Sequence, residues 1–243
     1  YLFGVSESPN INISANPVCL NTSTTFTSNT TITAPDVINI HEWDFNNDGV
    51  IDDNTTQPTH LYPTAGSYTV SYTATASSGC KATGTLVTMV YENPIATFTA
   101  NEVCFNTPTH FQDQSNGSGS PISNYFWDFT GDNVADITGL NNLNFTLPLL
   151  GNNIVNYTVS STPIAGLSCK SSTTQVVVTD AAPQAAFVFT NNCINNQPNY
   201  FDGSGSSTAT GSIVSYDWSF GDSQISSNTI STTNHIYNLP VVY

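Results

Sequence analysis

The chain has 243 residues, and its 17 acidic and two basic residues give a formal net charge of −15. Two lysines cannot neutralise the phosphates of a nucleic acid, and the same charge disfavours adsorption to an anionic membrane. No run approaches the roughly 20 apolar residues of a membrane span. Nucleic-acid binding and membrane insertion are therefore excluded for this sequence, whereas divalent cations are compatible with its charge.

Short stretches with the alternation of β-strands predict the fold class. Residues 24–28 (TTFTS), 68–75 (YTVSYTAT) and 174–179 (TQVVVT) alternate in this way, and Gly, Asn, Ser and Pro turns separate such stretches. No amphipathic helix of useful length is present. Short strands with regular turn signals predict an all-β chain of antiparallel sandwiches.

The chain is an internal repeat, and several markers share one register. A proline stands ten residues before a cysteine three times, at Pro9 and Cys19, Pro94 and Cys104, and Pro183 and Cys193. The three tryptophans fall in HEWDFNNDG, YFWDFTGDN and YDWSFGDSQ, at Trp43, Trp127 and Trp218. A chance repeat would not keep these residue types in step, so we expect one small sandwich per unit, each with a single core tryptophan.

The register also predicts the domain boundaries. Residues 1–8 match the last strand of a unit, 9–93 and 94–182 form two whole units, and 183–243 form a third unit without its last strand pair. We therefore expect the sequence to be a window on a longer array of such units. If a neighbouring subunit supplied the missing strands instead, the third unit would be completed by strand addition.

The units resemble PKD (polycystic kidney disease) domains, whose pattern is an early Phe, a W-x-F-G-D-G hairpin, P-x-H-x-Y and G-x-Y-x-V. The matching residues are Phe26, Phe111 and Phe201; Trp43-Asp44-Phe45, Trp127-Asp128-Phe129 and Trp218-Ser219-Phe220-Gly221-Asp222; Pro58 to Tyr62 and His235-Ile236-Tyr237; and Gly66 to Val70. The second unit departs, with Leu143-Asn144-Phe145 in the place of His-x-Tyr. The resemblance implies tandem immunoglobulin-like sandwiches, as in large secreted surface adhesin and filament proteins of Bacteroidota-type bacteria.

The cysteines predict one disulfide in each unit. Cys19 and Cys80 bound the first unit, and Cys104 and Cys169 bound the second. Cys193 is expected to be unpaired here, with its mate beyond the sequence. The alternative is buried free thiols in a cytosolic protein. Because the pairs repeat and no CxxC or Cys/His metal spacing occurs, we predict the disulfides Cys19–Cys80 and Cys104–Cys169 and an oxidising, extracellular location.

The hairpin after the first tryptophan has the spacing of a calcium loop. Its candidate ligands are Asp44, Asn46, Asp48, the Val50 carbonyl and Asp52, with Gly49 at the turn. Oxygen ligands at alternate residues converge on one ion in such loops. The usual bidentate Glu is absent, because Thr55 stands at the twelfth position. The alternative is a polar hairpin whose side chains bond local amides.

The other two hairpins carry a weaker form of the same pattern. In the second unit the candidate ligands are Asp128, Thr130, Asp132 and Asp136, with Asn133 in the place of glycine. In the third unit the matching positions hold Ser219, Gly221 and Ser223. We therefore place the possible calcium sites in the first two hairpins and expect no other cofactor.

No pattern in the sequence indicates catalysis. His60 and His235 belong to the H-x-Y element, where a structural role is favoured, and no nucleophile elbow, zinc-protease motif or phosphate loop occurs. We predict a non-catalytic, extracellular, cell-surface segment of a stalk or filament that serves attachment, gliding or prey capture. Its partners would be further PKD domains of the same chain, copies of itself in a filament, and a surface or prey-cell ligand.

The alternative function is an accessory module of a secreted hydrolase that acts on an insoluble polymer. PKD domains often accompany such catalytic domains. A long uninterrupted array favours the stalk, whereas a catalytic domain in the flanking sequence favours the accessory module. A carbohydrate-binding module would need exposed aromatic residues in a row, and the tryptophans here are expected to be internal.

Overall fold

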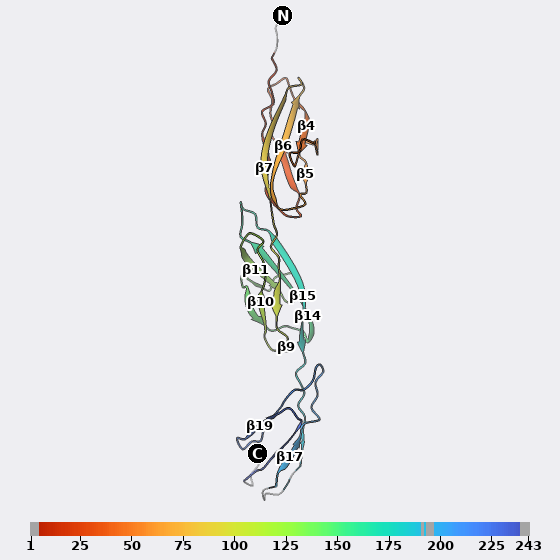
Figure 1. The fold of residues 1–243 in the computed structure, drawn as a ribbon, viewed down its shortest axis with the longest axis vertical. Helices are drawn as coiled ribbons and strands as arrows, with labels where there is room; N and C mark the ends of the chain where they lie inside the picture. The colour runs from red at the N-terminus through yellow and green to blue at the C-terminus, as the bar shows by residue number, and fades with distance from the viewer. Residues whose placement is uncertain (1–4, 191, 193–196, 239–243) are drawn as a thin grey trace.

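The computed structural model describes residues 5–190, 192 and 197–238, and in it three sandwiches follow one another end to end (Figure 1). All described elements are strands, which confirms the all-β prediction. Among the described residues no helix is long and apolar enough to cross a membrane. Residues 1–4 of the expected leading strand lie outside the described residues, and residues 5–8 form no strand.

The first sandwich packs a three-stranded sheet on a four-stranded sheet. The small sheet has the order β1-β3-β5, and the large sheet has the order β2-β7-β6-β4. The bounds are β1 (Ile13–Ala15), β2 (Val18–Cys19), β3 (Thr24–Ser28), β4 (Ile38–Asp44), β5 (Thr59–His60), β6 (Gly66–Ala76) and β7 (Lys81–Tyr91). The long strands β6 and β7 form one hairpin that runs the length of the sandwich.

The second sandwich repeats this plan. Its small sheet has the order β13-β10-β8, and its large sheet has the order β12-β11-β14-β15-β9. The bounds are β8 (Phe98–Ala100), β9 (Val103–Cys104), β10 (Thr109–Asp113), β11 (Ile122–Asp128), β12 (Ile137–Thr138), β13 (Asn142–Phe145), β14 (Gly151–Ser161) and β15 (Lys170–Asp180). The hairpin β14–β15 matches β6–β7, and the short parallel pair β9–β15 matches β2–β7.

The third sandwich has fewer described strands. One sheet has the order β16-β17-β20, and β18 pairs with β19. The bounds are β16 (Val188–Phe189), β17 (Asn199–Asp202), β18 (Tyr216–Ser219), β19 (Ile225–Asn228) and β20 (Thr232–His235). The described residues of this sandwich hold no counterpart of the hairpin β14–β15.

Aromatic residues from both sheets fill the two complete cores. Trp43 and Trp127 are fully buried, and each packs against a tyrosine of the long hairpin. The ring centroids of Trp43 and Tyr72 are 4.3 Å apart, and those of Trp127 and Tyr157 are 3.9 Å apart. The sequence therefore predicted these two tryptophans correctly as core residues. Trp218 is only half-buried in the third sandwich.

The element after the acidic hairpin packs the same way in all three sandwiches. His60 stacks on Phe45 and His235 stacks on Phe220, at ring-centroid distances of 4.5 and 4.2 Å. In the second sandwich Phe145 takes this place, 4.0 Å from Phe129. The strand register agrees, because Thr109 faces Phe145 as Thr24 faces His60.

The sequence alignment of the second unit was therefore wrong by two residues. The counterpart of His-x-Tyr is Phe145-Thr146-Leu147, and Leu143-Asn144-Phe145 precedes it. Leu147 is buried where Tyr62 lies in the first sandwich. The tyrosines of the other sandwiches donate hydrogen bonds from Tyr62 to the Phe45 carbonyl and from Tyr237 to the Phe220 carbonyl. The stacked His60 and His235 rings thus have a packing role.

Candidate functional site

The first acidic hairpin is held by hydrogen bonds between its carboxylates and its own backbone. Asp44 is buried, and its two oxygens accept hydrogen bonds from the amides of Asp48 and Gly49 at 3.2 and 2.8 Å. Asp52 accepts from the amide of Phe45 at 2.7 Å. These are the bonds of a hairpin whose acidic side chains cap local amides.

The remaining candidate ligands of this hairpin lie near its exposed tip. The Asn46 amide group donates to Asp48, and the Asn46 side-chain oxygen accepts from the Asp48 amide. Asp48 also accepts from the amide of Val50, whose side chain is exposed. Among the described residues no three acidic, histidine or cysteine side chains form a group that could hold a metal ion. The calcium site stays a prediction.

The second hairpin uses the same bonds without the glycine. Asp136 accepts from the Phe129 amide at 2.7 Å, as Asp52 does from Phe45. Asn133 has a φ of 67°, and its counterpart Gly49 has a φ of 88°. Asn tolerates the left-handed region better than other residues with a side chain. Asn133 therefore adopts the same turn as Gly49, and the two hairpins share their backbone geometry although the residue at this position differs.

Asp128 is the most heavily hydrogen-bonded carboxylate of the second hairpin. It accepts from the Asn156 side chain at 3.0 Å and from the amides of Gly131 and Asn133 at 2.7 and 2.9 Å. Burial by itself would raise the pKa of Asp128, but these hydrogen bonds and that from the Thr130 amide lower its pKa below the ordinary value. Asp132, another of the predicted ligands, caps only the Val134 amide.

We expect Asp128→Ala to lower the free energy of unfolding of the second sandwich by about 2–4 kcal/mol at pH 7, because it leaves several donors without an acceptor. The folded-state pKa is depressed, so the contribution is full above the unfolded pKa of about 4 and is lost as the pH falls through the folded value. Urea unfolding at pH 7 and at pH 3, with Asp132→Ala as the exposed control, measures both effects. An equal loss in the two variants would contradict the role of Asp128.

The disulfide found among the described residues joins two sandwiches. Cys19 of the first is bonded to Cys169 of the second, across a sequence separation of 150 residues. Near this junction the Asn93 side chain donates to the Leu20 carbonyl at 3.0 Å. Cys80 and Cys104 are free thiols. Cys193 lies outside the described residues.

The predicted pairs Cys19–Cys80 and Cys104–Cys169 are therefore wrong, and strand geometry gives the reason. Cys19 is the register partner of Tyr91 at the end of β7, whereas Cys80 precedes the first residue of β7. Eleven residues of β-strand span about 35 Å, and a disulfide needs Cα atoms within about 7 Å. The two cysteines of one sandwich thus lie at opposite ends of it, and so do Cys104 and Cys169.

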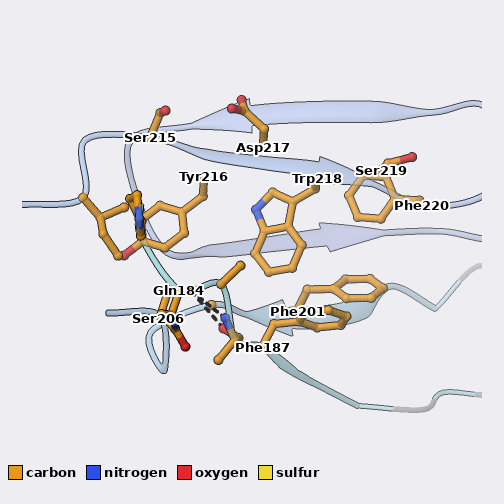
Figure 2. A pocket seen from close by; sticks show the side chains of 15 residues that line it. Gln184, Phe187, Phe201, Ser206, Ser215, Tyr216, Asp217, Trp218, Ser219 and Phe220 are labelled. Atoms are coloured by element: carbon orange, nitrogen blue, oxygen red, sulfur yellow. Dashed lines mark hydrogen bonds between the residues drawn. The ribbon is translucent and has the colours of Figure 1, made fainter. Parts of the chain in front are cut away.

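An apolar groove opens along β18 in the third sandwich. Tyr216 and Trp218 point from β18 toward Phe187 and Phe201 (Figure 2). These side chains line a pocket of about 320 Å³. In the second sandwich this side of the tryptophan strand pairs with β14, and Tyr157 stacks on Trp127. In the second sandwich the hairpin β14–β15 therefore lies on the side of the tryptophan strand where the third sandwich has its groove.

These features define a class of protein: serial immunoglobulin-like sandwiches with polar hairpins and a disulfide between two neighbouring sandwiches. The chain belongs to the PKD domain family, because the model of the family described as PKD domain matches residues 6–90 and 180–243. The second sandwich lies outside the matched residues but has the same order of elements. PKD domains are typically extracellular structural or adhesive modules, generally without catalysis, and a disulfide is typical of extracellular proteins.

Similar solved structures include single and serial sandwiches. The PKD1 domain of Vibrio anguillarum Epp is 27% identical, with a TM-score of 0.32, over 36% of this chain and 99% of that one. The fibronectin(III)-like modules of Clostridium thermocellum CbhA are 11% identical, with a TM-score of 0.37, over 70% and 93%. Three N-terminal domains of the bacteriophage RB49 outer capsid protein Hoc are 12% identical, with a TM-score of 0.38, over 90% and 78%. Among curated proteins no match was found.

Proposed function

We propose that this chain is a non-catalytic segment of an extracellular stalk or filament on a cell surface, where it holds an adhesive end away from the cell. The observation that carries the proposal is the bond between Cys19 and Cys169 across the junction of two PKD sandwiches. The three sandwiches lie end to end, and the connection from β7 to β8 is short (Figure 1). A short connection and a covalent bridge at one junction restrict bending there.

The third sandwich fits the same function. Its groove beside Trp218 is apolar, and in the array that we propose a hairpin of the same chain covers it. The partners in this proposal are further PKD domains and copies of the chain in a filament. A surface or prey-cell ligand would bind at the distal end.

Calcium at the first acidic hairpin belongs to the same proposal, as a means of stiffening the loop. Its support is the alternation of Asp44, Asn46, Asp48 and Asp52 along one hairpin, together with the contact between the Asn46 and Asp48 side chains. The cation would compete with the backbone amides for the same oxygens, so binding requires a rearrangement of the tip.

Electron microscopy of the cells that make the protein tests the proposal. We expect deletion of the gene to remove surface fibres, and the double variant Cys19→Ser, Cys169→Ser to leave fibres that are more curved. Imaging in calcium and then in chelator reports on the hairpin, because softening in chelator would support the calcium site. The variant Asp48→Asn is the matched control for that step.

Unchanged cell surfaces with the protein free in the medium would overturn the stalk. That outcome would favour the alternative function, an accessory module of a secreted hydrolase that acts on an insoluble polymer. Co-sedimentation of the chain with insoluble polysaccharide or protein would then be the next measurement.

A further inference from the structure

We propose that the disulfide between Cys19 and Cys169 recurs along the array as a staple that bonds each PKD repeat to the next. In each staple a strand cysteine, at the position of Cys19, bonds a hairpin cysteine, at the position of Cys169, in the following repeat. Cys104 and Cys80 are the two half-sites of this kind that remain in the chain, one for the following repeat and one for the preceding repeat. Cys104 would bond the hairpin cysteine of the following PKD repeat of the same chain. Cys80 would bond the strand cysteine of the preceding repeat. The inference rests on the repeat geometry and does not depend on the stalk function.

Cys104 has the same backbone environment as the bonded Cys19. Cys19 faces Tyr91 and Cys104 faces Asp180, each in a short parallel pair at the end of a long strand. The next residue donates its amide to the facing carbonyl in both cases, at 2.8 Å from Leu20 and 2.7 Å from Phe105. Each cysteine carbonyl also accepts a 3.0 Å bond from the amide three residues later. Cys104 is therefore built and oriented as a strand half-site.

The junction around Cys104 supports this assignment. Cys104 is exposed, and its facing residue Asp180 accepts a hydrogen bond from the Thr210 hydroxyl of the third sandwich at 3.0 Å. The near end of the third sandwich therefore reaches the residue that faces Cys104. In the second sandwich the hairpin cysteine Cys169 lies at the corresponding end, the one nearer the preceding sandwich. The reason is that Ser161 faces Ile122 and donates its amide to the Cys169 carbonyl. A hairpin added to β18 would carry its cysteine to the same junction.

Cys80 shares with the bonded Cys169 the hydrogen bond that closes the end of the long hairpin. The amide of Ala76 donates to the Cys80 carbonyl at 2.9 Å, and the amide of Ser161 donates to the Cys169 carbonyl at 2.9 Å. The Cys80 sulfur lies 3.7 Å from the carbonyl oxygen of Ser6. Ser6 stands three residues before Pro9, as Tyr91 stands three residues before Pro94, and Tyr91 is the residue that faces Cys19. Cys80 therefore lies where a preceding strand cysteine would come.

Each staple would form by thiol–disulfide exchange in an oxidising compartment. A strand thiolate attacks the disulfide of an oxidoreductase and forms a mixed disulfide. The hairpin thiolate then attacks the strand sulfur of this mixed disulfide, and the oxidoreductase leaves as a thiolate. The two cysteines lose two protons and two electrons, and the disulfide of the oxidoreductase is reduced to two thiols. One S–S bond forms in the array for each one that is broken in the donor.

Mapping of the disulfides in the full protein, taken from the cells that make it, tests the staple. Free thiols are blocked with N-ethylmaleimide before extraction, and the protein is digested without reduction. We expect the Cys104 peptide to be unblocked and joined to a hairpin peptide of the following repeat, and the Cys80 peptide to be joined to a strand peptide of the preceding repeat. Reduction should release both.

Blocked Cys104 and Cys80 in that protein, or a bond from Cys104 to Cys169 or Cys193, would overturn the proposal. A bond from Cys104 to a second copy, recognised by covalent dimers on a non-reducing gel, would also overturn it. The isolated 243-residue chain is the control, since both thiols should react there with N-ethylmaleimide. Cys104→Ser in the full protein should remove one linkage and leave Cys19–Cys169 intact, which separates a lost half-site from a failure to fold.

Discussion

Trypsin is expected to cut the oxidised chain after residues 81 and 170 and to leave fragments 1–81 and 82–170 joined by a disulfide. Lys81 and Lys170 are the only basic residues, and both are exposed. Cys19 lies in the first fragment and Cys169 in the second, so the bond between them must bridge the cut. Pairing within each unit would put both cysteines of a pair on the same fragment. The two disulfide arrangements are therefore distinguished by whether the fragments stay joined or separate before reduction.

The measurement is a non-reducing gel and an intact-mass spectrum of the digest, made on denatured chain with its thiols blocked. The joined species should disappear on reduction and in Cys19→Ser, whereas Cys80→Ser should retain it. Separation of the two fragments before any reductant is added would show that the sandwiches are not bonded to each other.

The second large effect is expected from Trp127→Ala, which should lower the free energy of unfolding of the second sandwich by about 3–5 kcal/mol. Trp127 is fully buried, and its ring contacts Phe98, Phe111 and Tyr157 at centroid distances of 5.2, 5.6 and 3.9 Å. Its indole nitrogen also donates to the Leu140 carbonyl at 2.8 Å. A small domain has only about 5–15 kcal/mol in total, so this loss leaves it marginally folded.

Hydrogen exchange followed by mass spectrometry resolves the effect by sandwich. Protection should fall by about two to four orders of magnitude in residues 94–182, since about 1.4 kcal/mol is a factor of ten, and stay nearly unchanged in the first sandwich. The matched control is Trp218→Ala, because Trp218 is half-buried, lacks a stacked hairpin tyrosine, and has no hydrogen-bond partner for its indole nitrogen among the described residues. Equal losses from the two substitutions would mean that the hairpin tyrosine contributes little to the core.

Local spacing was enough to predict the packing within each sandwich. The tryptophans and the early phenylalanines fall at fixed positions relative to turns, and alternation along a strand decides which side chains face inward. Trp43 is a core residue as predicted, and the structure places Phe26 beside it, with ring centroids 5.6 Å apart. The histidine element was also placed correctly in the first and third units, because its residues are the same there.

Where the sequence misled, the missing information was three-dimensional. Grouping the cysteines by repeat unit pairs Cys19 with Cys80 and Cys104 with Cys169, but the two cysteines of a unit stand at opposite ends of an eleven-residue strand. The length of that strand was readable from the run between Cys80 and Tyr91, and it was the signal that could have excluded the pairing. The second unit was misaligned because Phe145 takes the position that histidine holds in the other two units. A comparison of residue types along the chain could not recognise this replacement, since only the flat ring is shared.

The bond at the junction also decides how tension passes along the chain. A pull applied at Pro9 reaches Cys19 along about ten residues, crosses to Cys169 and leaves along β15 to Asp180. This covalent route has about 20 residues and measures about 70 Å when extended, which is close to the combined length of two sandwiches about 35 Å long. Residues 20–168 lie off the route. Most of both sandwiches is therefore shielded from load, and their unfolding would add almost no length to a fibre while the disulfide is intact.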